Sequence, residues 1–189
     1  MGLQYTDAAV VRMVQEALNA AGFDCGTPDG QAGSKTRAAL EAYQRDKGIN
    51  VNGVITDELL EAMGIADKIE EAAKLEASKA EYSTDFSYES LMRNPAQHKG
   101  KKYKISGRVM QAYSNSDPDK YYSQLFMYRD GSYDQLINVR YDEKLMSSRI
   151  LEDDYITVWG TMEDLYTYET VSRRENTIPF ITADIVEIN

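Results

Sequence analysis

Four groups of neighbouring carboxylates have a spacing that could support catalysis or ion binding. A pair of carboxylates can hydrolyse a glycosidic bond, and several carboxylate oxygens together can bind Ca²⁺. Most of these residues fall in predicted turns, where a solvated acidic side chain is the simpler interpretation. The groups are Asp117 with Asp119, Asp130 with Asp134, Glu152 with Asp153 and Asp154, and Glu163 with Asp164.

Histidine and cysteine, the other residue types most used in catalysis, occur once each, as His98 and Cys25. A Ser-His-Asp site needs a histidine held by a second group, and a structural zinc site usually takes four Cys or His ligands. A lone surface histidine is far more often inert than a general base. We therefore predict no catalytic residue, no metal and no cofactor, and the enzyme hypothesis depends on the carboxylates alone.

The chain is acidic along its whole length. It has 31 Asp and Glu residues against 21 Lys and Arg residues, a formal net charge of -10. Residues 1–80 carry 8 basic and 13 acidic residues, and residues 81–189 carry 13 and 18, so each part has a net charge of -5. Binding to a phosphate backbone depends on positive charge. We therefore predict that nucleic acid is not a partner.

The sequence also limits the compartments to be considered. No apolar run approaches the ~18 residues of a membrane-spanning helix. The first residues lack the basic and apolar regions of a signal peptide. We therefore expect an extracellular or cell-wall-associated protein if an export signal has been removed, and otherwise a cytoplasmic one. The single cysteine excludes an intrachain disulfide.

The first third of the chain predicts three short helices, each followed by a glycine. The first covers about residues 7–21, with Thr6 or Asp7 as its N-cap and Gly22 after its end. Its apolar residues recur with the helical period of 3.6. They are Val10, Val14, Ala17, Leu18 and Ala21.

The second helix is predicted at about residues 35–47, with Ser34 as candidate N-cap, and the third begins after Thr56. Gly48 and Gly64 end these helices. Beyond them, residues 66–80 are rich in Ala, Glu and Lys and poor in apolar residues. This composition predicts a charged, partly helical linker.

From about residue 85 the pattern changes to β-strands, preceded by a short helix or turn within residues 86–97. Alternating apolar residues predict five strands, and residues 143–151 are predicted to form a short helix between the third and fourth. This order is typical of an OB-fold barrel, in which Gly107 and Gly160 would permit sharp curvature or bulges. The strands are predicted at Lys102–Tyr113, Tyr122–Arg129, Gln135–Tyr141, Tyr155–Glu163 and Ile178–Ile188.

Tyrosine is concentrated in this second part, which holds 12 of the 14 tyrosines of the chain. OB barrels bind oligonucleotides and oligosaccharides with aromatic faces. Tyrosine also suits a half-buried strand without any ligand. If a ligand face exists, the acidic balance favours a saccharide, a peptide or a protein. The candidate residues are Tyr113, Tyr122, Tyr128, Tyr166 and Tyr168.

Spaced motifs in residues 14–56 resemble the peptidoglycan-binding domain family. The resemblance covers about residues 5–65 and is specific because several elements recur in order. It implies a three-helix bundle that binds cell-wall glycopeptide and anchors a partner domain. The motifs are Val14-Gln15, Leu18, Gly22-Phe23, Asp29-Gly30, Gly33, Thr36, Ala39, Tyr43-Gln44, Gly48-Ile49 and Gly53-Val54-Ile55-Thr56.

The motif residues have two interpretations. In the structural one, Asp29 and Gly30 make a turn, Thr36 hydrogen-bonds the loop backbone, Tyr43 packs in the core, and Gln44 hydrogen-bonds the loop. In the functional one, exposed polar groups near the loops bind the ligand. The candidate ligand-binding residues are Asp29, Gln31, Ser34 and Arg37.

The second part resembles small OB-like domains of unassigned role that follow a spacer in exported Gram-positive bacterial proteins. The resemblance rests on Asn94-Pro95, Gly107-Arg108-Val109, Trp159-Gly160 and Thr177-Ile178-Pro179. It implies no activity.

Together these observations predict a multidomain α plus β protein. A three-helix peptidoglycan-binding-like bundle at residues 1–65 is followed by a charged helical linker at 66–84 and a five-stranded OB-like β-barrel at 85–189. The favoured function is non-catalytic binding or anchoring to peptidoglycan, with the barrel recognising a further protein or saccharide. The alternative is a protein–protein adaptor or regulatory protein that keeps the fold without binding glycan.

Overall fold

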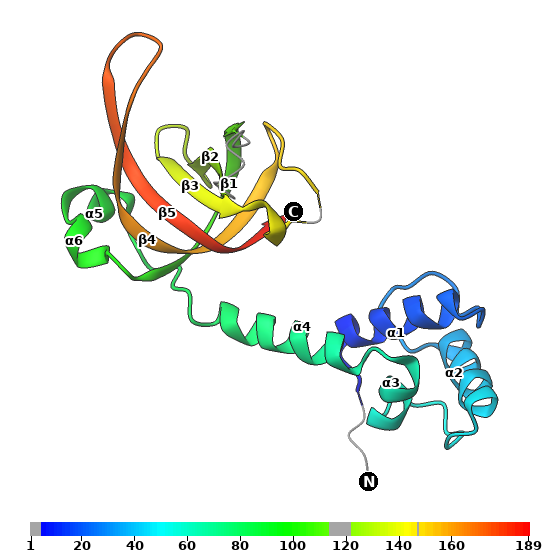
Figure 1. Ribbon diagram of the computed structural model, residues 1–189. Helices are drawn as coiled ribbons and strands as arrows, with labels where there is room; N and C mark the ends of the chain where they lie inside the picture. The colour runs from blue at the N-terminus through cyan, green and yellow to red at the C-terminus, as the bar shows by residue number, and fades with distance from the viewer. Residues whose placement is uncertain (1–4, 114–121, 147) are drawn as a thin grey trace. The chain divides into compact units, whose positions relative to one another are not determined.

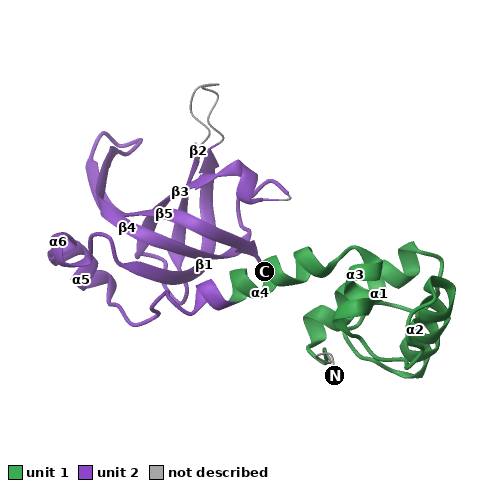
Figure 2. Cartoon of the chain, turned by 60° about the horizontal axis from the view of Figure 1, so that its bottom comes forward, with its two compact units in different colours: residues 1–76 green, residues 77–189 purple. Residues whose placement is uncertain are grey.

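A computed structural model describes residues 5–113, 122–146 and 148–189. The chain forms two compact units, residues 1–76 and residues 77–189 (Figures 1 and 2). We call them the helical unit and the barrel unit. Among the described residues, no helix has the length and apolar character needed to cross a membrane.

The helical unit contains α1 (Ala8–Ala20), α2 (Ser34–Lys47), α3 (Asp57–Met63) and most of α4 (Ala66–Lys79). Helix α4 covers most of the predicted linker, and its Ile69 side chain is buried in the core of this unit. The core is built from side chains of all four helices and of the connecting loops. It consists of Val11, Val14, Leu18, Cys25, Ala39, Leu40, Tyr43, Ile55, Leu59, Leu60 and Ile69.

The buried face of α1 differs from the predicted one. Val11, Val14, Gln15 and Leu18 are buried, whereas Val10 is half-buried and Ala21 is exposed. Two adjacent valines make the apolar stripe ambiguous by one position, and the packing against the other helices decides between them. The consequence is that Gln15, a polar residue, faces the interior.

The helix ends follow local capping chemistry with one correction. The Asp7 carboxylate accepts hydrogen bonds from the backbone N–H groups of Ala9 and Val10, and the Thr56 hydroxyl caps α3. Ser34 does not cap α2, because it is already the first helical residue and Gly33 occupies the N-cap position. The Gln31 carbonyl accepts from Gly33 N at 2.9 Å and Thr36 Oγ1 at 3.3 Å, so the turn closes before Ser34.

The barrel unit is a closed five-stranded barrel with the strand order β1-β2-β3-β5-β4. All neighbouring strands are antiparallel except β3 and β5, which are parallel. This closed Greek-key order is that of an OB-fold. The strands are β1 (Lys102–Tyr113), β2 (Tyr122–Arg129), β3 (Leu136–Asp142), β4 (Tyr155–Glu169) and β5 (Glu175–Ile188).

The barrel interior is filled by alternate residues of all five strands, as the sequence alternation predicts. Two short helices, α5 (Tyr88–Arg93) and α6 (Pro95–His98), precede β1, and Leu91 of α5 is fully buried in the same core. Gly160 lies at a register shift between β4 and β5, and a side chain there would meet the Thr182 carbonyl oxygen at 2.5 Å. Close packing of strands thus explains this strand glycine.

Two predicted elements of the barrel unit need correction. Of the described residues between β3 and β4, Glu143–Leu145 are helical, as the 3₁₀-helix η1, so the predicted helix over residues 143–151 is too long. Ile150 is buried in the barrel core, and the Asp154 carboxylate accepts a hydrogen bond from Leu151 N across a turn at residues 152–153. Strands β4 and β5 are also longer than predicted, and their hairpin extends beyond the barrel (Figure 1).

Within the barrel unit, the end of α4 packs on the outside of the barrel. The Lys79 ammonium lies 4.7 Å from the ring centre of Trp159, and Lys104 lies 5.2 Å from the same ring. Lys79 also pairs with Glu187. Trp159, the single tryptophan of the chain, is only 4% exposed as a result.

His98 is half-buried rather than on the open surface. Its Nε2 lies 2.8 Å from Ser90 Oγ, and its Nδ1 lies 2.6 Å from the Tyr103 hydroxyl. The imidazole therefore links α5, α6 and β1 through two hydroxyl groups, which is a structural role.

Candidate functional site

The helical unit has a surface loop that is hydrogen-bonded to a buried glutamine. Gln15 is 1% exposed, and its Nε2 donates to Asp29 Oδ1 at 3.0 Å, to Gln31 O at 3.1 Å and to Thr36 Oγ1 at 3.0 Å. Its Oε1 accepts from Gly30 N at 2.9 Å. Every polar atom of the amide is used, so the loop is fixed to α1.

A second loop repeats this arrangement around Gln44, which is also 1% exposed. Its Nε2 donates to Asn52 Oδ1 at 2.9 Å and to Val54 O at 3.1 Å. Its Oε1 accepts from Asn52 N at 3.0 Å and from Gly53 N at 2.9 Å. We call the two segments the Asp29–Gly30 loop and the Asn52–Gly53 loop.

The Asp29 carboxylate is part of the first loop's framework. Asp29 Oδ1 accepts from Gln15 Nε2 and from Gln31 N at 2.8 Å. The hydrogen bond from Gln15, followed by that from the Gln31 backbone, lowers the pKa of this carboxyl below its usual value. Asp29 therefore stays ionised and places a fixed negative charge at the surface.

The structure places the four predicted ligand-binding residues near these loops. Asp29 and Gln31 lie in the first loop, and Ser34 and Arg37 lie one turn apart at the start of α2, where i and i+3 side chains are neighbours. All four are exposed. The Arg37 side chain also lies against Gly53, because a Cβ built on that glycine would be 2.7 Å from Arg37 Cγ. Arg37 thus lies beside the second loop while following the first in sequence.

The predicted hydrogen bond from Thr36 to the Asp29–Gly30 loop agrees with the geometry. The predicted bond from Gln44 to that loop is wrong, and Gln15, which the prediction did not name in this role, makes it instead. The signal was present, because Gln15 follows Val14 as Gln44 follows Tyr43, and each pair precedes an Asx-Gly dipeptide. The amide of Gln44 contacts the Asn52–Gly53 loop, whereas Gln15 holds the Asp29–Gly30 loop.

The barrel unit gathers aromatic side chains on one outer face. Phe126 is only 7% exposed, and its ring centre lies 5.0 Å from Tyr168, 5.9 Å from Tyr113 and 6.3 Å from Tyr166. Tyr166 and Tyr168 are stacked with an interplanar angle of 17°. We call this set the aromatic face, and it consists of Tyr113, Phe126, Tyr128, Tyr166, Tyr168 and Phe180.

Four of the five predicted tyrosines lie on this face. Tyr113, Tyr166 and Tyr168 surround Phe126, and Tyr128 packs against the same cluster. The side chain of Tyr122 lies outside the described residues. Phe126 and Phe180 were not predicted, although Phe126 lies two residues before Tyr128 and therefore on the same side of β2.

The acidic groups have separate local partners. Asp164 is 3.3 Å from Lys99, and hydrogen bonding by Leu165 N and then by Lys99 lowers its pKa. Glu163 pairs with Arg140 at 3.8 Å, and Asp134 accepts from Ser132 Oγ at 2.7 Å. Asp117 and Asp119 lie outside the described residues. In the described part of the chain, no group of three or more His, Cys, Asp or Glu side chains is arranged to hold a metal ion.

Residues 7–63 match the family model described as "Putative peptidoglycan binding domain". This match covers α1, α2, α3 and both loops of the helical unit, and ends before α4. It agrees with the resemblance seen in the sequence motifs. No curated protein matches the chain.

Solved structures are similar to part of this chain. One is the small single-stranded DNA-binding protein from Streptomyces coelicolor, at 13% identity and a TM-score of 0.38, covering 48% of this chain and 94% of that one. Another is the second OB-fold domain of replication protein A from Methanococcus maripaludis, at 19% identity and a TM-score of 0.32, covering 48% and 85%. At such values the ligands of these proteins carry no argument for this chain. The prediction that nucleic acid is not a partner stays a prediction.

Proposed function

We propose that the helical unit binds peptidoglycan and anchors the barrel unit at the cell wall without catalysing a reaction. The observation that carries this proposal is the match of residues 7–63 to the peptidoglycan-binding family model. An extracellular, wall-associated location is part of the same proposal.

The loop geometry supports a binding role. Because Gln15 and Gln44 fix both loops through hydrogen bonds, the loop backbones are already ordered before a ligand arrives. A preordered surface loses less conformational entropy on binding than a flexible one. The exposed Gln31 and Ser34 side chains offer hydrogen bonds to a glycopeptide, and the Arg37 guanidinium can bind a carboxylate with two parallel hydrogen bonds.

Co-sedimentation of the full chain with purified peptidoglycan sacculi tests the proposal. We expect retention of the unaltered chain and about tenfold weaker retention of Arg37→Ala, because a charge-assisted hydrogen bond to the ligand is lost. Arg45→Ala is the matched control, since Arg45 is an exposed arginine in the last turn of the same helix. Its retention should equal that of the unaltered chain.

If sacculi retain the full chain at no salt concentration, the proposed anchoring function is contradicted. The protein–protein adaptor would then be the leading function. Equal loss in Arg37→Ala and Arg45→Ala would show that retention depends on net charge rather than on these loops. Thermal unfolding of each variant identifies any loss that arises from misfolding, because Arg37 also packs beside Gly53.

A further inference from the structure

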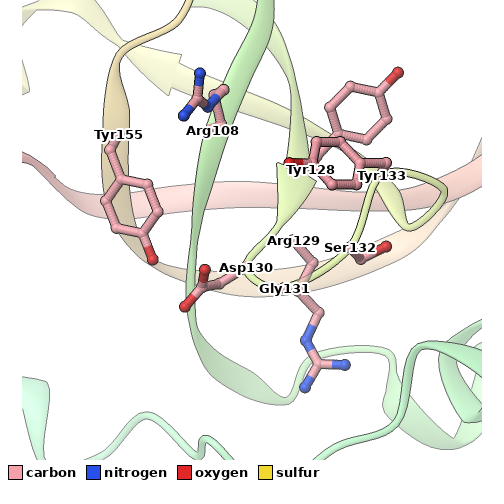
Figure 3. A pocket seen from close by; sticks show the side chains of 8 residues that line it. All are labelled: Arg108, Tyr128, Arg129, Asp130, Gly131, Ser132, Tyr133 and Tyr155. Atoms are coloured by element: carbon pink, nitrogen blue, oxygen red, sulfur yellow. The ribbon is translucent and has the colours of Figure 1, made fainter.

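The barrel unit contains a pocket of about 300 Å³ that is separate from the centre of the aromatic face. Residues of β1, the end of β2, the β2–β3 turn and the start of β4 line it (Figure 3). Those that matter for its chemistry are Arg108, Tyr128, Asp130, Tyr133 and Tyr155. A volume at the low end of the range for ligand pockets, roughly 300–1,000 Å³, suits one small ring.

The sheet register places three of these side chains in one row. Arg108 of β1 pairs directly with Tyr128 of β2 on one side and with Tyr155 of β4 on the other. Directly paired residues of neighbouring strands project to the same side of a sheet. The row therefore has a guanidinium between two phenol rings on the outer surface of the barrel. Tyr133 adds a third ring from the β2–β3 turn and is 91% exposed.

Charges around the pocket are nearly balanced. Arg108 Nη1 lies 3.6 Å from Asp153 Oδ1, so its positive charge has an acidic neighbour. Desolvation and a hydrogen bond to the Asp130 carboxylate raise the pKa of Tyr155, so its hydroxyl stays protonated and faces that carboxylate (Figure 3). Arg129 points away from Arg108 and Tyr155, with its guanidinium 4.7 Å from the ring centre of Phe86. The Arg108 charge is therefore offset by Asp153, and the Arg129 charge lies away from Arg108 and Tyr155.

The chemistry of the pocket combines rings with planar polar groups. Aromatic rings pack against the C–H face of a saturated ring, while the Asp130 carboxylate accepts hydrogen bonds from hydroxyl groups and the Arg108 guanidinium donates them. A purely apolar ligand would leave these polar groups unpaired, and an anionic ligand would meet Asp130 and Asp153. We propose that this pocket binds a single neutral sugar ring. The proposal is independent of peptidoglycan binding by the helical unit.

Titration of the full chain with the neutral trisaccharide of N-acetylglucosamine, followed by NMR, tests this site. We expect shifts at the pocket and about tenfold weaker binding by Tyr133→Ala, because a ring that stacks on the ligand is removed. Tyr133 is exposed, so its replacement leaves the fold intact. Tyr113→Ala tests the competing site, since Tyr113 is a partly exposed tyrosine of the aromatic face, which is itself a candidate ligand face. Asp130→Asn should weaken binding without altering the barrel, because Asp130 is exposed.

Several outcomes would overturn the proposal. One is that the trisaccharide does not bind. Another is that Tyr113→Ala loses binding while Tyr133→Ala keeps it. The third is that a single-stranded oligonucleotide, and not the sugar, shifts the NMR signals of the pocket residues. Sacculus retention of Tyr133→Ala separates this site from the proposed anchor. If sacculi retain Tyr133→Ala while its binding of the trisaccharide is weakened, the proposed pocket is supported, whatever the result for Arg37→Ala.

Discussion

The Asp29–Gly30 loop and the Asn52–Gly53 loop share a central set of hydrogen bonds but differ in the residue at their turn. In each, an Asx Oδ1 accepts from a buried glutamine Nε2 and from the backbone N–H two residues later. In each, the glutamine Oε1 accepts from the following glycine N–H. The first loop uses a carboxylate that can titrate, and the second uses an amide that cannot.

This difference shows that the buried glutamine, rather than the turn residue, is the shared requirement. Gln15 precedes its glycine by 15 residues and Gln44 precedes its glycine by 9, so the connecting chain varies while the contacts with the Asx side chain and the glycine N–H are kept. Both glutamines lie within α-helices that form the core. A helix therefore sets the position of each loop.

Replacing either buried glutamine should reduce the stability of the fold more than any other change considered in this comparison. Gln44 Oε1 accepts from two backbone N–H groups and Gln15 Oε1 from one, so Gln44→Leu leaves more buried donors unpaired. We expect Gln44→Leu to reduce the free energy of unfolding by about 4 kcal/mol and Gln15→Leu by about 3 kcal/mol. Urea titration followed by circular dichroism measures both.

Glutamate at the same positions should reverse this order. The carboxylate introduced by Gln15→Glu would face the Asp29 carboxylate, whereas the one introduced by Gln44→Glu would face the Asn52 amide, which can rotate to donate. An equal effect of the two glutamate variants would show that the loops are electrostatically equivalent, contrary to our comparison.

Alanine at the loop glycines should have a smaller and unequal effect. Both glycines have positive φ, 78° for Gly30 and 66° for Gly53. A Cβ at Gly30 would be 2.6 Å from the Ala8 carbonyl oxygen, which is rigid backbone, whereas at Gly53 it would meet the flexible Arg37 side chain at 2.7 Å. We expect a loss of about 3 kcal/mol for Gly30→Ala and about 1 kcal/mol for Gly53→Ala. Urea midpoints that rank the two variants the other way would contradict the steric argument.

The pH dependence should show the smallest difference. The pKa of Asp29 is lowered in the folded protein, chiefly by Gln15, so its contribution is present above the unfolded pKa and is lost as pH falls through the folded pKa. Asp29→Asn should therefore lose less stability on acidification from about pH 7 to about pH 3 than the unaltered chain. Asn52→Asp should lose more. Thermal unfolding across this pH range measures the difference, and identical slopes for all three proteins would refute it.

Much of the fold is predictable from local pattern because β1 alternates between buried and more exposed residues, whereas β3 and β4 each contain a run of buried residues. The predicted bounds of β1 and β2 agree with the structure. The extension of β4 beyond Glu163 was not predictable, because Tyr166 and Tyr168 pair with residues of β5 and do not fill the barrel interior. The α1 face was misassigned by one residue because Val10 and Val11 fit the period equally well.

The sites were predictable to different extents. The Asp29–Gly30 loop follows from a motif within a short stretch of sequence, so its exposed residues could be named in advance. The pocket around Asp130 joins β1, a turn and the start of β4, which are far apart in the chain. Spacing along the sequence therefore gave no signal for Arg108 or Tyr155, and only the register of the strands places them together.

The position of Trp159 has a spectroscopic consequence. Because it is the single tryptophan, all tryptophan fluorescence of the chain comes from the barrel unit. The ammonium groups of Lys79 and Lys104 lie over its ring. Its emission therefore reports whether the last residues of α4 are attached to the barrel. It does not report unfolding of the core around Gln15. Circular dichroism reports the helices of the helical unit. The two signals together distinguish unfolding of one unit from unfolding of the other in a single titration.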